Sequence, residues 1–214
     1  MSSDRNPLVV PVNILVEGIT DEPVAKRLLE YVGFTVGNVF GRNGKSDLLR
    51  RLPNYNQAAR SRLTPWFVLR DLDNDAVCAS QAIQKWPPQP SEGMRLRVAV
   101  RAIEAWMMAD AEHLAAFLSV SSSRMPTNPD SETDPKQTLI NIARSSSSRS
   151  IREGFVPRHG SGARVGPLYV ERLITFAQSH WQPDETATRS ESLRRCIQAL
   201  STLKFEDLHT RDVS

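Results

Sequence analysis

Short apolar runs alternate with amphipathic stretches through the first half of the chain. Apolar runs at residues 9–16, 66–69 and 96–100 predict buried strands, and a further short strand is expected near residues 34–40. Between them, apolar residues recur at helical spacing from Val24 to Val32, after a cap at Thr20 or Asp21 and before the stop at Gly33. Two more helices are expected at residues 46–61, interrupted or kinked at Pro53, and at 76–85. Repeated strand–helix pairs of this length predict an α/β fold with a Rossmann-like parallel sheet of about four strands flanked by helices.

The second half of the chain is predicted to be helical. Helices are expected at residues 103–110, 111–118, 136–144, 168–180 and 189–203, and the serine tract 145–148 is expected to be mobile. Residues 119–135 are rich in Ser, Pro, Asn and Asp, which predicts a loop or linker. We therefore expect an α/β domain over residues 1–118, the linker 119–135, and a helical extension over 136–214 that packs on the first domain.

Composition excludes several classes of protein. The 214 residues, 40% hydrophobic and 24% charged, are typical of a globular chain. Cys78 and Cys196 lack CxxC spacing, which argues against a disulfide framework and against a zinc site. No run of about 18 apolar residues occurs, and the first residues lack an apolar signal core. We expect a cytoplasmic protein without a membrane segment.

Acidic residues follow two of the predicted strands. Glu17 and Asp21 come after the first apolar run, and Asp71, Asp73 and Asp75 come after the run at 66–69. The carboxyl ends of parallel strands meet at one edge of the sheet, where open α/β sheets bind ligands. Five carboxylates there would repel one another, and hard oxygen ligands suit Mg²⁺, Mn²⁺ or Ca²⁺. The pattern predicts a divalent metal site.

Other interpretations of the aspartate cluster remain open. An EF-hand loop is excluded, because Ala76 and Ala82 stand where that loop needs Gly and Glu. The cluster also resembles the Asp-x-Asp of haloacid-dehalogenase-type phosphatases, although Asp75 replaces their usual Thr or Val. A solvated turn after a strand is the third alternative.

Basic residues concentrate in two stretches although the net charge is only +3. Residues 42–62 hold six Lys and Arg against one acid, and residues 144–172 hold six Arg against two acids. Arg42 and Lys45 open a helix, whereas Arg158, His159 and Arg164 belong to a glycine-rich loop. Both stretches could contact phosphates or be solvated surface.

The sequence around Lys45 resembles part of a nucleotide-binding loop but lacks one of the glycines that such a loop needs. Gly44-Lys45-Ser46 resembles the end of a P-loop, but that loop needs glycine at the position of Val39. Lys45 at a helix start can still bind a phosphate of nucleic acid.

Glu104 is an acid within an otherwise apolar helical stretch. Burial of an unpaired carboxylate is costly, so Glu104 is expected to bind a metal or to pair with a cation such as Arg101. Asp110 ends the same stretch, where it is either a further acidic ligand or the cap of the helix that begins at Ala111.

Two motifs resemble a known superfamily. Glu17-Gly18-x-x-Asp21 and Asp71-x-Asp73, each after an apolar strand, resemble the Toprim domain of topoisomerases, primases and OLD nucleases over residues 9–110. Gly44-Lys45, Arg70-Asp71-Leu72-Asp73 and the string Ile-Glu-Ala-Trp-Met-Met-Ala-Asp at 103–110 are similar to the Toprim-like DUF4276 proteins.

The resemblance implies roles for individual residues. It makes Glu17 a metal ligand and a general acid or base, and makes Asp71 and Asp73 metal ligands. Asp21 matches an acidic position of the OLD branch, Asp75 adds a neighbouring carboxylate, and Glu104 fits a late acidic position. The implied activity is a nuclease dependent on Mg²⁺ or Mn²⁺, with two metal ions and DNA as the favoured substrate.

One part of the resemblance is missing. OLD-type nucleases use a later lysine near the scissile phosphate, and residues 139–203 contain no lysine. Arg158, His159 or Lys45 could substitute for it.

Partners and rival functions follow from the same analogy. Related Toprim nucleases work with an ABC-type or SMC-type ATPase, often in anti-phage defence, and here such an ATPase would be a separate subunit because the chain has no ATPase motif. A topoisomerase or primase is disfavoured by the chain length. A ribonuclease that matures RNA and a non-catalytic subunit of an ATPase complex remain alternatives.

Overall fold

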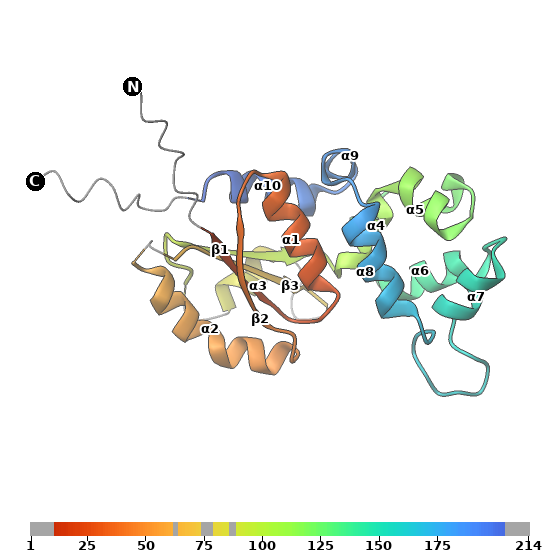
Figure 1. Ribbon diagram of the computed structural model, residues 1–214, viewed down its shortest axis with the longest axis horizontal. Coiled ribbons are helices and arrows are strands. Elements are labelled where there is room, and N and C mark those ends of the chain that lie inside the picture. The colour runs from red at the N-terminus through yellow and green to blue at the C-terminus, as the bar shows by residue number, and fades with distance from the viewer. Residues whose placement is uncertain (1–10, 62–63, 74–78, 86–88, 204–214) are drawn as a thin grey trace, which may run out of the picture.

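A four-stranded parallel sheet forms the centre of the molecule (Figure 1). The computed structural model describes residues 11–61, 64–73, 79–85 and 89–203. The strands are β1 (Val12–Val16), β2 (Val36–Gly41), β3 (Trp66–Asp71) and β4 (Met94–Ala99), in the order β2-β1-β3-β4. All neighbouring pairs are parallel, so the predicted fold class is confirmed.

Helices alternate with the strands in the first half of the chain. After β4, the described residues form only helices, short 3₁₀ turns and loops. Those of the first half are α1 (Asp21–Tyr31), α2 (Lys45–Ala59) and α3 (Ala79–Lys85). The later helices are α4 (Ile103–Ala109), α5 (Ala111–Leu118), α6 (Pro135–Arg144), α7 (Arg149–Phe155), α8 (Tyr169–Ser179), α9 (Pro183–Ala187) and α10 (Glu191–Ser201). Two short 3₁₀ turns, η1 (Ser122–Arg124) and η2 (Pro129–Ser131), precede α6.

The sheet is covered on both faces, as the buried central strands β1 and β3 require. Successive side chains of a strand point to opposite faces. Ile14 and Val16 of β1 pack in the core that contains α1, whereas Leu15 belongs to the core that contains Leu48 and Leu52 of α2. α10 packs against β4, and its residues join the first of these cores. The helices α5 to α8 lie beyond the carboxyl edge of the sheet (Figure 1).

The expected interruption at Pro53 is contradicted. α2 runs continuously from Lys45 to Ala59, because Leu52 and Ala59 pack against the sheet and tertiary contacts offset the missing backbone donor. The serine tract is fixed rather than mobile. Ser146 is buried, the Ser147 hydroxyl donates to the Ser119 carbonyl, and Ser148 caps the helix α7, which the sequence did not predict.

Residues 119–135 are held by contacts with the last helix. Met125 and Pro129 are buried, and Asp130 accepts hydrogen bonds from the Ser190 hydroxyl and from the backbone N–H of Ser192, at 2.8 and 2.9 Å. The short helix α9, also missed from the sequence, precedes this contact. Among the described residues, no helix combines the length and the apolar character needed to cross a membrane.

Candidate metal and phosphate site

Acidic side chains meet at the carboxyl edge of the sheet. Glu17 follows β1 directly, Asp21 is the first residue of α1, and Asp71 is the last residue of β3. β1 and β3 are neighbours, with Val16 paired to Leu69. Glu104 reaches the same edge because α4 begins four residues after β4 ends.

Asp21 is almost fully buried, with 3% of its surface exposed. Its Oδ2 accepts a hydrogen bond from the Gly18 N–H at 2.7 Å, which closes the turn between β1 and α1. Burial raises the pKa of Asp21 to about 7, and the charges of Glu104 and Glu17 act in the same direction. Near neutral pH, Asp21 therefore carries a proton about half of the time.

Asp71 links the end of β3 to the start of α4. Its Oδ1 accepts a hydrogen bond from the Ile103 N–H at 3.0 Å, so the carboxylate satisfies one of the free donors of that helix. Burial raises the pKa of Asp71 well above its ordinary value, and the charges of Asp21 and Glu104 raise it further. The carboxyl groups of three elements thus interact electrostatically.

The chain leaves the pleat immediately after Asp71. Leu72 is buried, and Asp73 is exposed in a left-handed conformation with φ of 48°. Arg101 stabilises this turn, because its Nη1 donates to the Asp73 carbonyl at 2.9 Å. The side chains of Asp71 and Asp73 therefore both line the same cleft. Asp75 lies outside the described residues.

Glu104 is buried with 2% of its surface exposed. The Tyr169 hydroxyl donates to its Oε1 at 2.9 Å, and Lys136 Nζ lies 3.8 Å from the same oxygen. Its Oε2 is buried and has no hydrogen-bond partner among the described residues. The predicted pairing with Arg101 is wrong, because the Arg101 guanidinium is engaged by the Asp73 carbonyl.

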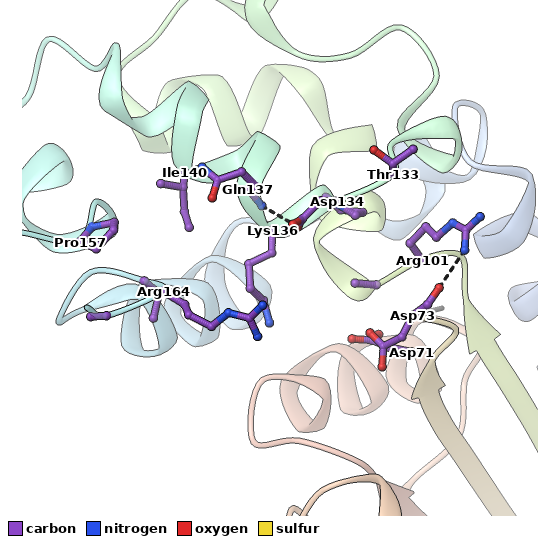
Figure 2. Close-up of a pocket in the computed structure, with 14 residues that line it drawn as sticks. Asp71, Asp73, Arg101, Thr133, Asp134, Lys136, Gln137, Ile140, Pro157 and Arg164 are labelled. Carbon is purple, nitrogen blue, oxygen red and sulfur yellow. Dashed lines mark hydrogen bonds between the residues drawn. The ribbon is translucent and has the colours of Figure 1, made fainter. Parts of the chain in front are cut away.

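A cleft of about 680 Å³ opens in front of Asp71. Asp71 and Asp73 lie on its sheet side, and Lys136 and Arg164 project into it from the opposite wall (Figure 2). Lys136 comes from the first turn of α6, and Arg164 from the loop between α7 and α8. The cleft thus places cations across from the acidic cluster.

The basic residues predicted from the sequence are dispersed. Arg164 lines the cleft, Arg158 lines a second cleft, and His159 is exposed and lines neither of them. The loop before α2 lies against the end of β1, where the Gly44 N–H donates to the Glu17 carbonyl at 2.9 Å. Neither Arg42, which forms an ion pair with Glu22, nor Lys45 lines the first cleft.

Lys136 and Tyr169 are the residues that sequence reasoning missed. Lys136 lies three residues before the lysine-free stretch 139–203. The sequence does indicate that Lys136 lies in the first turn of a helix, because Asp134 followed by Pro135 is typical of a helix start. The structure agrees, since Asp134 caps α6 by accepting a hydrogen bond from the Gln137 N–H at 2.9 Å. Nothing in the sequence marks Tyr169, which is 65 residues from its partner Glu104.

The acidic cluster fits a divalent cation by its chemistry, although its oxygens are spread apart. The pKa values of Asp21 and Asp71 are raised, and Glu104 Oε2 lacks a hydrogen-bond donor among the described residues. No three of Glu17, Asp21, Asp71, Asp73 and Glu104 have oxygens within 4.8 Å of one another. Binding of a cation would therefore draw the carboxylates inward.

A second cluster of residues that can bind metals lies at the C-terminal end of α4. Ligand atoms of Asp110, His113 and Glu185 lie within 4.8 Å of one another, so this group could hold a metal ion. Asp110 Oδ1 is 2.8 Å from His113 Nδ1, and this hydrogen bond raises the pKa of His113. Asp110 Oδ2 accepts from the Gln182 N–H at 2.9 Å, and the side chain makes no capping bond to α5.

The chain was compared with protein-family models, with curated proteins and with solved structures, and none of the three comparisons finds a match. The functional conclusion therefore depends on the geometry of the site.

Proposed function

We propose that the protein is a divalent-metal-dependent phosphodiesterase that cleaves nucleic acid, with DNA as the favoured substrate. The observation that carries the proposal is a cleft lined by Asp71 and Asp73, beside the buried Asp21 and Glu104, into which Lys136 and Arg164 project from the opposite wall. Phosphodiester hydrolysis needs cation-binding carboxylates on one side of the phosphate and positive charge on the other. The described residues supply both the carboxylates and the positive charge.

Asp21, Asp71 and Glu104 are the residues that would hold Mg²⁺ or Mn²⁺. All three have their carboxyl groups on the ends of regular elements, which fixes them relative to the phosphate. A bound cation would neutralise the repulsion among them, lower the pKa of a water molecule and stabilise charge on the phosphoryl oxygens.

Lys136 and Arg164 would bind the anionic oxygens of the phosphate. Arg164 can donate two parallel hydrogen bonds, whereas Lys136 acts as a compact charge. Lys136 Nζ is also 3.8 Å from Glu104 Oε1, so the same ammonium group connects the acidic cluster to the phosphate position. We propose that Lys136 takes the place of the later lysine of OLD-type nucleases.

Glu17 would accept the proton of the attacking water. Its side chain is 17% exposed at the edge of the cluster, and Arg70 Nε lies 3.6 Å from its Oε2. Arg70 is fully buried, so it holds the Glu17 carboxylate in one orientation. A carboxylate held at the edge of a metal site is placed as a general base must be.

Cleavage of labelled nucleic acids by the purified chain tests the proposal. Single-stranded DNA, duplex DNA and structured RNA would be incubated with Mg²⁺, Mn²⁺ or EDTA. We expect metal-dependent cleavage by the parent protein and a loss of about 100-fold or more in Asp71→Asn, which keeps the acceptor for the Ile103 N–H. Asp47→Asn, a substitution in the first turn of α2 that removes a carboxylate outside the acidic cluster, serves as the control. Absence of cleavage of all three substrates by the parent would refute the proposal, and cleavage of RNA alone would favour the ribonuclease.

A further inference from the structure

A second, basic cleft lies beside the first one. Its volume is about 420 Å³, and its lining residues are Arg144, Arg152, Glu153, Val156, Pro157 and Arg158. Arg144 ends α6, Arg152 belongs to α7, and Arg158 follows α7. Three guanidinium groups from consecutive segments thus surround one cavity that has a single carboxylate in its wall.

The single carboxylate does not cancel this positive charge. Glu153 forms an ion pair with a fourth arginine, Arg149, with Nε 2.7 Å from Oε1. This hydrogen bond lowers the pKa of Glu153, and the charges of Arg152 and Arg158 lower it further. The cavity therefore retains a net positive charge and favours an anion.

The two clefts share one wall. Pro157 lines both of them, and Figure 2 shows Pro157 at the opposite end of the first cleft from Asp71, with Arg164 between them. Basic residues therefore line both of these adjoining clefts. Two adjoining basic clefts suit the repeated charges of a nucleic-acid backbone.

Neither cleft has an aromatic wall. The described residues that line them include no Phe, Tyr, Trp or His. Bases of single strands are usually recognised by stacking on aromatic rings, whereas arginine and lysine contact phosphates without reading the sequence. The lining therefore favours recognition of the backbone over recognition of bases.

We propose that the second cleft is a phosphate-binding subsite that holds the substrate strand on one side of the cleaved bond. This inference rests on the proposed function and adds a substrate class to it. The substrate is a nucleic-acid strand long enough to fill both clefts, bound through its phosphates and independently of base sequence. Arg144 and Arg158 are both exposed, whereas Arg152 is half-buried, so Arg144 and Arg158 are the proposed contacts with the strand. Arg144 Nη1 donates to Asn141 Oδ1 at 3.1 Å, and the remaining donors of its guanidinium can bind a phosphate.

Binding of labelled oligothymidylates of increasing length tests the subsite directly. Fluorescence anisotropy in EDTA would compare the parent with the double variant Arg144→Gln/Arg158→Gln. We expect long strands to bind the variant about tenfold more weakly, and the slope of log affinity against log salt to fall by about 1.4, at about 0.7 for each lost contact. A dinucleotide, which is too short to reach the second cleft, should bind both proteins equally.

Two further variants separate the subsite from general charge effects. Arg194→Gln/Arg195→Gln removes the same charge from exposed positions of α10 and should leave the affinity unchanged. Arg144→Lys/Arg158→Lys keeps the charge and should restore most of the salt slope. Affinity of the Gln variant equal to that of the parent, or equal losses in both Gln variants, would overturn the subsite. Length-dependent binding through Arg144 and Arg158 without any cleavage would support the subsite and refute only the nuclease.

Discussion

Removing the charge of Asp21 should stabilise the protein when no metal is bound. Asp21→Asn keeps an oxygen that can accept the Gly18 N–H and removes a carboxylate that burial disfavours. Because the pKa of Asp21 rises from 3.8 to about 7 on folding, the native state binds more protons than the unfolded chain between these pH values. Stability of the parent therefore falls as the pH rises through this window, and the loss is complete above it.

The size of the effect follows from the same shift. Ionising Asp21 in the native state costs on the order of 4 kcal/mol above pH 7, and burying the amide group of Asn costs about 1 kcal/mol. We expect the variant to be more stable by about 3 kcal/mol at about pH 8, which is about 6 to 12 °C in melting temperature for a chain of this size. Below about pH 3 the order should reverse, because the parent carboxyl is then mostly protonated in both states.

Thermal unfolding followed by circular dichroism in EDTA, across this range of pH, measures the difference. Saturating Mn²⁺ should raise the melting temperature of the parent more than that of the variant, because the cation binds the native state and removes the repulsion. The control Asp47→Asn should shift stability in the opposite direction, since the hydrogen bonds of Arg51 and Arg50 lower the pKa of Asp47. A variant that is less stable than the parent at about pH 8, or a difference that does not change with pH, would refute this reasoning.

Three other predictions concern single contacts. Tyr169→Phe should destabilise the fold by about 1 to 3 kcal/mol in chemical denaturation, because Glu104 Oε1 loses a buried donor; an unchanged denaturation midpoint would contradict the role of this bond. Lys136→Gln should lower the cleavage rate about 100-fold while preserving the melting temperature within about 1 °C, and a wild-type rate would exclude Lys136 from the phosphate position. His113→Gln should reduce thermal stability at pH values below 6.5 and lose this effect as the pH rises above the raised pKa of His113; a difference that grows with pH would exclude the ion pair with Asp110.

The succession of strands and helices along the first half was accessible from the sequence, because burial on both faces makes central strands such as β1 and β3 largely apolar runs. Val68 and Leu69 are an example, since they are buried against opposite cores of the sheet. The position of Asp71 at a strand end followed from this pattern. The helices α7 and α9 were not accessible, because they have only seven and five residues and are held by caps and packing rather than by a periodic pattern.

The opposite wall of the site could not be predicted for a related reason. The acidic residues come from strand ends, whose common edge is fixed by the parallel topology. Lys136 and Arg164 come from a helix start and a loop, and only the tertiary packing of α6 and α8 brings them to the cleft. The same packing gives Glu104 its partner Tyr169 instead of the nearby Arg101.

Anomalous diffraction from crystals soaked in Mn²⁺ tests the central claim most directly, because it locates the cation without any assumption about the substrate. The account predicts an anomalous peak at the sheet edge, with oxygens of Asp71 and of Asp21 or Glu104 at about 2.0 to 2.6 Å from the ion. It also predicts that the peak disappears in Asp71→Asn. A peak only at Asp110, His113 and Glu185, or a peak at the sheet edge that is unchanged in Asp71→Asn, would contradict the assignment of the acidic cluster as the catalytic metal site.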